Sequence, residues 1–374
     1  MGLFGPDSVP HTSYKTNNNI AVFNNVKSSS RQKMAYGLIV ILVLSILVMA
    51  LPKILPKKDT PVTPVVPAVS VDVPAFSGDS AFVYVKKQVD FGPRVPGSPA
   101  HKSCAAWLVA SFKKYGLTVI EQPFKAKAYF GTLDAVNIIG QYKPELPNRI
   151  LLCAHWDSRH IADKDTKDQD KPILGADDGA SGVAVLLEMA RILQQNPVEY
   201  GVDFICFDAE DLGDERTPSS DASIMAQSGG NTTETWCLGS QYWSQNLHKP
   251  GYKAHFGILF DMVGASGAKF PREGISMLKA PEFVNKIWAV AAELGFDDLF
   301  VNTPAGQITD DHYFVMRGTN IPTVDIIGMP KSPPMFGDHH HTHFDNLTII
   351  DNDVLRKVGQ VTATVIYRAA AQLR

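Results

Sequence analysis

The sequence predicts an α/β protein, a three-layer domain with a central mixed, mostly parallel sheet flanked by helices, preceded by one transmembrane helix. Three observations lead to this prediction. From residue 77 onward, short and nearly continuous apolar runs alternate with segments of helical periodicity, which is typical of a sheet buried on both faces. Acidic residues and histidines follow these runs. Near the N-terminus, one apolar stretch has no charged residue.

The leader before the domain divides into three predicted parts. Residues 1–33 are polar and aperiodic, which indicates a disordered cytoplasmic tail. Residues 34–51 carry no charge and have Lys or Arg on both sides, so we expect a transmembrane signal-anchor helix over 34–52. A cleaved signal peptide is the alternative, although the polar segment before the apolar stretch is long for one. Residues 53–76 contain Pro every few positions, which favours an extended stalk.

The charge of the chain is unevenly distributed. The formal net charge is −3, but residues 1–58 carry seven Lys or Arg and one Asp, a charge of +6 that leaves −9 for the remainder. An acidic body gives no electrostatic reason to expect nucleic acid as a partner. Four cysteines are too few for a disulfide scaffold, and they lack the paired spacing of metal ligands. We therefore leave Cys104, Cys153, Cys206 and Cys237 out of the predicted site.

The body, residues 77–374, is predicted to be one folded domain. Five segments show helical periodicity: Asp79–Val89, Lys102–Tyr115, Gly182–Gln195, Pro281–Leu294 and Asp351–Ala371. Four strand-like apolar runs lie between them: Arg149–Asp157, Val202–Asp211, Phe256–Gly264 and Ile321–Gly328. Their alternation with helices is the reason to expect a sheet that is at least partly parallel.

Carboxylates and imidazoles gather at the ends of these runs and in the loops beside them. The candidates are His155, Asp157, Asp178, Glu210, Asp211, Asp261, Asp310 and His341. A single Asp at a strand end is more often a cap or turn former. Several that converge on one sheet edge, where ligands bind in α/β sheets, would repel one another unless a cation lay among them. Imidazole and carboxylate ligands without thiolate fit a catalytic Zn²⁺ site with an open position.

Asp178 stands directly before a helix that starts with the small residues Gly179 to Gly182. The N-terminus of that helix favours the charged, ligating form of a nearby carboxylate. The simpler interpretation, Asp178 as a helix cap, is compatible with ligation by its other oxygen.

Eight motifs carry a resemblance to a known family: FGPRVPGSPAH (91–101), HWDSRHIADKD (155–165), PILGADDGASG (172–182), FDAEDLG (207–213), WCLGSQYW (236–243), FDMVGA (260–265), TDDHYF (309–314) and HTHFDN (341–346). In this order they resemble the zinc aminopeptidases of the di-zinc exopeptidase fold and, among these, the bacterial glutaminyl-peptide cyclotransferases. The resemblance covers about residues 79–374. It implies a zinc exopeptidase-like fold and Zn²⁺ as cofactor.

The resemblance also implies a role for each candidate residue. In the cyclases one zinc ion is bound, and the matching ligands are Asp178, Asp211 and His341. Glu210 would move a proton from the attacking amine to the departing nitrogen. Two further carboxyl groups would complete an acidic network with it: Asp261 and Asp310.

The aminopeptidases of the same superfamily bind two zinc ions, and this alternative stays open. His155 and Asp261 would then hold the second ion. In the cyclase interpretation Asp157 would orient His155 rather than bind metal. Trp236 and Phe336 are the candidate walls of the substrate pocket.

Three details favour the cyclase. The position after Glu210 is Asp211 rather than the Glu usual in peptidases, two Asp residues precede His312, and the second and fifth motifs look like those of bacterial cyclases. One detail departs from the animal cyclases, which carry a pocket Trp where this chain has His340. With His339 and His343, we expect His340 on the solvent side of its turn.

The implied activity is cyclisation of N-terminal glutamine to pyroglutamate with release of ammonia. The expected partners are peptides or proteins with N-terminal Gln, and the membrane through the N-terminal helix. Enzymes that modify mature N-termini act mostly on exported peptides. We therefore expect a single-pass protein of the cell inner membrane with its catalytic domain in the periplasm.

Overall fold

The computed structural model describes residues 71–214 and 235–372. The chain separates into two units, Met1–Ala68 and Val69–Arg374, and every described residue belongs to the second. The predicted tail, the predicted transmembrane helix and residues 53–70 of the predicted stalk lie outside the described residues. Among the helices that are described, none has both the length and the apolar character required to cross a bilayer.

A six-stranded mixed sheet with the order β1-β2-β4-β3-β5-β6 forms the centre of the second unit. The strands are β1 (Thr118–Ala128), β2 (Gly131–Tyr142), β3 (Arg149–His155), β4 (Gly201–Phe207), β5 (Gly257–Asp261) and β6 (Thr323–Ile327). The last four run parallel to one another. β1 and β2 form an antiparallel hairpin, and β2 pairs antiparallel with β4. The predicted mixed, mostly parallel sheet is confirmed.

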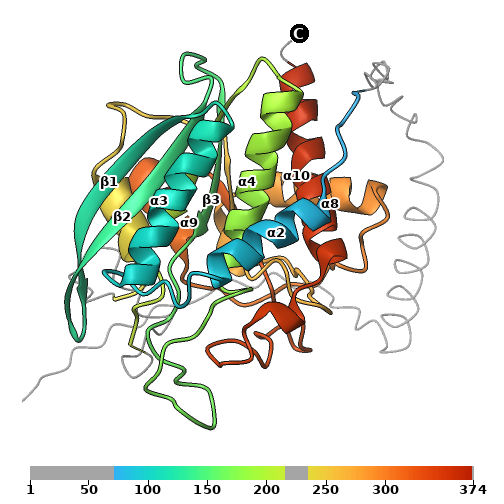
Figure 1. Ribbon diagram of the computed structural model, residues 1–374. Helices are drawn as coiled ribbons and strands as arrows, with labels where there is room; N and C mark the ends of the chain where they lie inside the picture. Colours follow the sequence, from blue (N-terminus) through green and yellow to red (C-terminus); the bar gives the residue numbers. More distant parts are fainter. Residues whose placement is uncertain (1–70, 215–234, 373–374) are drawn as a thin grey trace, which may run out of the picture. The chain divides into compact units, whose positions relative to one another are not determined.

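Helices cover both faces of this sheet, as Figure 1 shows with α3 and α4 in front of it and α9 behind. One face is covered by α2 (Gly78–Val89), α3 (Pro99–Lys114), α4 (Ala180–Gln195), α8 (Pro281–Glu293) and α10 (Asn352–Ala371). The other face is covered by α6 (Leu238–Gln245) and α9 (Asp311–Thr319). Short elements complete the fold: α7 (Gly274–Lys279) and the 3₁₀ helix η1 (Leu347–Ile349).

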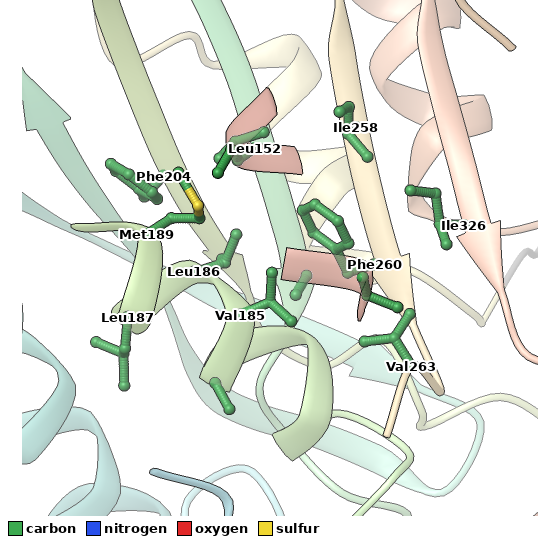
Figure 2. Packing of buried hydrophobic residues seen from close by; sticks show 14 of the residues in the cluster. Leu152, Val185, Leu186, Leu187, Met189, Phe204, Ile258, Phe260, Val263 and Ile326 are labelled. Atoms are coloured by element: carbon green, nitrogen blue, oxygen red, sulfur yellow. The ribbon is translucent and has the colours of Figure 1, made fainter. Parts of the chain in front are cut away.

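Burial on both faces explains the continuous apolar runs. Successive strand residues point to opposite faces, so Leu152 and Phe204 pack with α4 in the larger cluster drawn in Figure 2. Their neighbours Leu151 and Ile205 pack with Trp243 of α6 in the second cluster. The sheet is thereby fixed from both sides, and the loops at the carboxyl ends of its strands are left to form a site.

The hairpin β1–β2 was not among the predicted strands. β1 is the edge of the sheet, and its residues are mostly exposed or half-buried. The polar residues and Pro123 of β1 therefore interrupt the apolar pattern by which a strand is predicted, although proline is tolerated in an edge strand. The short helices α6, α7 and α9 were also not predicted, since none is long enough to show a clear period.

The folded body begins a few residues before the expected boundary at Ser77. Phe76 is only 3% exposed and belongs to the main core cluster, and the side chain of Gln360 on α10 donates to the backbone oxygen of Pro74. A Cβ at Gly359 would lie 2.2 Å from the Phe76 ring. Glycine in α10 is therefore what allows the incoming segment to pack against that helix.

Candidate metal centre and catalytic cavity

The candidate residues meet where the carboxyl ends of three strands adjoin. β3 ends at His155 and β5 ends at Asp261, while Glu210 and Asp211 follow the end of β4 by a few residues. β4 and β5 flank β3 on opposite sides. This arrangement is the switch point at which open α/β sheets bind ligands.

Asp157 fixes the turn that carries Glu210 and Asp211. Its two carboxylate oxygens accept hydrogen bonds from the backbone N–H groups of Glu210 and Asp211, at 3.1 and 3.2 Å. Ala209, just before them, has φ of 56° in the left-handed region. Such a conformation costs free energy in a residue with a Cβ and is held by its surroundings. Asp157 is a large part of those surroundings.

Asp345 fixes the loop that carries Asp178. Its carboxylate accepts hydrogen bonds from the backbone N–H groups of Asp177 and Asp178, at 2.7 and 3.1 Å. Asp345 lies four residues after His341, so the loop that brings the histidine also positions the carboxylate opposite it.

Three of the predicted ligands form one buried group. His341 Nε2 lies 3.4 Å from Asp211 Oδ1 and 3.9 Å from Asp178 Oδ2. Ligands about 2.0–2.2 Å from a tetrahedral zinc ion are separated from one another by roughly 3.3–3.6 Å. The spacing of these atoms is close to that separation.

The chemistry of these side chains also fits a zinc ion. Burial, together with the charges of Arg159 and Lys164, lowers the pKa of His341 well below its usual range, so the ring is in the neutral form that binds metal. Arg159 Nη1 donates to Asp211 Oδ1 at 2.9 Å. Asp211 Oδ2 is buried and has no hydrogen-bond partner among the described residues, which leaves that oxygen available to a cation.

A second group shares Asp178 with the first. His155 Nε2 lies 2.9 Å from Asp178 Oδ1 and 3.3 Å from Asp261 Oδ1. His155 Nδ1 lies 3.4 Å from Asp157 Oδ1. Asp157 therefore stands both beside His155, as predicted, and beneath the turn of Glu210 and Asp211.

A third group contains the predicted proton carrier. Glu210, Cys237 and Asp310 each place one polar atom within 4.8 Å of the others, and the Cys237 thiol donates to Glu210 Oε1 at 3.1 Å. Cys237 was set aside on its spacing in the sequence. That exclusion was wrong, because the start of α6 brings this cysteine next to Glu210.

Burial raises the pKa values of the carboxyl groups in the cavity. It raises the pKa of Asp310 to about 7, and the charge of Asp261 adds to the effect. It raises the pKa of Asp261 to about 6, although the contact with His155 opposes it. It also raises the pKa of Glu210 well above its usual range, with Asp211 and Asp310 adding to the effect while His155 opposes it. With pKa values of about 6 and about 7, Asp261 and Asp310 can accept and return protons near neutral pH.

The groups open into a cavity of about 270 Å³ with aromatic walls. Trp236 and Phe336, the predicted pocket residues, both line it. The Trp236 ring stacks on His341 with 5.8 Å between centroids, and the Arg159 guanidinium lies 4.8 Å from the Trp236 ring centroid. A Cβ at Gly213 would lie 1.9 Å from the indole, so this glycine allows Trp236 its position.

Two further features were not predicted. His340 was expected toward solvent but is buried at the cavity wall, with its ring 3.7 Å from that of His341. Behind the wall, the buried Glu273 carboxylate accepts from the backbone N–H of Ile308, which lines the cavity, and lies 3.1 Å from His312 Nε2. His312 belongs to the motif TDDHYF (309–314), but Glu273 has no motif around it that singles it out.

Comparison with known proteins places the chain in a family. The sequence profile of peptidase family M28 matches residues 137–366, which is more than half of the chain. Bacillus subtilis aminopeptidase YwaD is 27% identical over 67% of this chain and 48% of its own length, so the chain spans about half of that relative.

Two solved structures are more similar. One is a glutaminyl cyclase of Bacteroides thetaiotaomicron bound to N-acetylhistamine, with 45% identity, coverage of 79% of this chain and 99% of that chain, and a TM-score of 0.74. The other is a Zn-dependent exopeptidase of Parabacteroides distasonis, with 44% identity, the same coverage and a TM-score of 0.74. The match of the family over residues 137–366 and the similarity of these structures agree, and the chain belongs to peptidase family M28.

Proposed function

We propose that this chain is a glutaminyl-peptide cyclotransferase, which converts the N-terminal glutamine of peptides and proteins to pyroglutamate and releases ammonia. The observation that carries the proposal is the grouping of Glu210, Asp261 and Asp310 around a cavity of about 270 Å³ beside the zinc-ligand group. Pockets for drug-sized ligands measure about 300–1,000 Å³, so this one suits a single terminal residue. The 45% identity with the Bacteroides cyclase supports the same reaction.

The reaction needs one bond made and one broken within a single residue. The α-amine nitrogen attacks the γ-carbonyl carbon, and the bond from that carbon to the side-chain nitrogen breaks. Zn²⁺, when held by Asp178, Asp211 and His341, would polarise the γ-carbonyl. Since both reacting groups belong to the same glutamine, the contribution of the protein is largely orientation.

Glu210 carries the proton in this proposal. It accepts a proton from the attacking amine and gives it to the departing nitrogen, which leaves as ammonia. The hydrogen bond from Cys237 and the backbone bonds to Asp157 hold the Glu210 side chain and its turn in place. Asp261 and Asp310 provide negative charge for the α-amine and share protons with Glu210.

The test compares two peptides on the full-length chain. A Gln-initiated peptide is expected to lose ammonia at constant chain length, while a Leu-initiated peptide is expected to stay intact. Mass spectrometry reads both outcomes. Release of free leucine, with no ammonia from the Gln peptide, would overturn the proposal.

A di-zinc aminopeptidase is the second candidate, and the group of His155, Asp178 and Asp261 is the observation that favours it. Glu210 would then deprotonate a water molecule between two metal ions. Metal analysis of the active protein separates the candidates, since the cyclase proposal expects one zinc per chain and the aminopeptidase requires two.

We also propose that residues 34–52 anchor the chain in the cell inner membrane and that the catalytic domain lies in the periplasm, where N-termini of exported peptides are available. The uncharged stretch 34–51 and its basic flanks support the anchor. Protease treatment of spheroplasts is the test, with degradation of the catalytic domain expected and its protection contradicting the orientation.

A further inference from the structure

We propose that a second depression beside the catalytic cavity, here called the outer cleft, binds the residues that follow the N-terminal glutamine, and that it favours an apolar residue followed by an acidic one. The outer cleft measures about 480 Å³, and its walls include Ile308, Met329, Lys331, Met335, Phe336 and His340. The inference rests on the proposed function, since it assumes that a peptide N-terminus occupies the catalytic cavity.

Shared walls connect the two spaces. Lys164, Ile308, Phe336 and His340 line both the catalytic cavity and the outer cleft. A larger depression of about 590 Å³ adjoins the outer cleft at Lys331 and Asp338 but shares only Met262 with the catalytic cavity. The shared walls therefore point to the outer cleft as the exit for a peptide whose first residue fills the cavity.

The spacing of a peptide chain agrees with this exit. Consecutive residues of an extended chain advance by about 3.3–3.6 Å, and a cavity suited to one residue leaves no room for the second. The second and third residues must therefore lie at and beyond the wall formed by Ile308 and His340.

The charge along this path changes sign. Besides Lys164 on the shared wall, the catalytic cavity is lined by four carboxyl groups: Asp178, Glu210, Asp261 and Asp310. The outer cleft has two cationic side chains, Lys164 and Lys331, and one carboxylate, Asp338. A peptide with its α-amine inside and a carboxylate outside matches this order, and the reverse order does not.

The outer cleft also has apolar walls. Met335 is 57% exposed although it is a large hydrophobic residue, and it lies in the cleft with Met329 and Phe336. Methionine and aromatic surfaces accept varied apolar side chains. An apolar second residue would cover this surface, and an acidic third residue would then reach Lys331.

The expected preference is modest because Lys331 is partly exposed and already bound. Lys331 Nζ lies 2.6 Å from Asp338 Oδ1, and both side chains are open to solvent. Exposed ion pairs of this kind change equilibria by about two- to fivefold. Salt weakens such a contact, so the preference should shrink as ionic strength rises.

The experiment uses the full-length chain and three peptides. Gln-Ala-amide ends near the shared wall and serves as the reference, while Gln-Leu-Glu-amide and Gln-Leu-Lys-amide extend into the outer cleft with opposite charges. We expect kcat/KM for the Glu peptide to exceed that for the Lys peptide by about two- to fivefold at low salt.

Two variants and two matched controls locate the effect. Lys331→Glu should reverse the preference, while Lys86→Glu, which alters an exposed Lys–Asp pair on α2, should keep it. Met335→Ser should lower kcat/KM for both extended peptides and leave the reference unchanged. Leu278→Ser, at a residue with similar exposure on α7, should alter none of the three.

The outcomes separate this inference from the proposed function. If the reference is cyclised but the two extended peptides react equally in the wild type, or Lys331→Glu does not reverse their order, the outer cleft is not the binding site and the cyclase proposal stands. If no peptide releases ammonia, the proposed function is overturned and the outer cleft loses its ligand with it.

Discussion

Replacement of Asp157 by asparagine tests whether this buried carboxylate holds the catalytic turn. In the wild type, both oxygens accept backbone hydrogen bonds, from Glu210 N and Asp211 N. The asparagine oxygen can keep one bond, but its NH₂ group would face the other N–H donor. A lost charge-assisted bond and an unsatisfied buried donor each cost about 1–3 kcal/mol. We expect the zinc-loaded variant to lose about 2–4 kcal/mol of unfolding free energy and about ten- to 100-fold in kcat, since the turn carries both Glu210 and the proposed ligand Asp211.

Urea unfolding of the zinc-loaded protein and steady-state ammonia release are the two assays for Asp157→Asn. Asp203→Asn is the matched control, because Asp203 is equally buried and accepts hydrogen bonds from Arg149 near the start of β3 and β4. The control should lose stability and keep kcat at temperatures where it is folded. An Asp157→Asn protein with unfolding free energy within about 0.5 kcal/mol of wild type and unchanged kcat would refute this account of the turn.

Three further predictions address the cavity. Glu210→Gln should bind zinc as the wild type does and lose turnover, as metal analysis and ammonia release would show; retained turnover would exclude its role as proton carrier. Burial raises the pKa of Asp310 to about 7 in the folded state, whereas the unfolded chain releases this proton near pH 4. Between these pH values the folded state therefore binds more protons, so the free energy of unfolding falls as pH rises. With zinc chelated, urea unfolding should show wild type losing up to about 3 kcal/mol more than Asp310→Asn between pH 5 and 8, and parallel curves would contradict this. Gly213→Ala, whose Cβ would overlap the Trp236 indole, should cost about 1–3 kcal/mol and alter tryptophan fluorescence; an unchanged spectrum would show that the ring is not displaced.

The parallel half of the sheet could be predicted because burial on both faces leaves a simple signal. Each of the four apolar runs became a strand, β3 to β6. The hairpin β1–β2 gave no such signal because β1 is an edge strand with polar residues and Pro123. An edge strand owes its existence to pairing with its neighbour, and the local sequence does not reveal that partner.

The candidate site, like the sheet, could be predicted only in part. His155, Asp178 and Asp261 could be found because they stand at strand ends or a helix start. Cys237 and Glu273 could not, since each reaches the site through tertiary packing, Cys237 by a left-handed turn before α6 and Glu273 through the loop behind the cavity wall. His340 was expected outside because a polar turn usually faces solvent, and here Phe336 and Lys164 contact it instead.

In the proposed zinc site, the bonds from Asp345 to the loop of Asp178 tie zinc affinity to the completion of folding. Asp345 and Asp177 are 168 positions apart in the chain, and the proposed ligands Asp178 and His341 come from the same two distant loops. A partly folded chain that lacks the C-terminal loop would hold only part of the ligand set, so zinc should bind late and report the native state. Each tenfold rise in free zinc above its dissociation constant should then add about 1.4 kcal/mol to the free energy of unfolding.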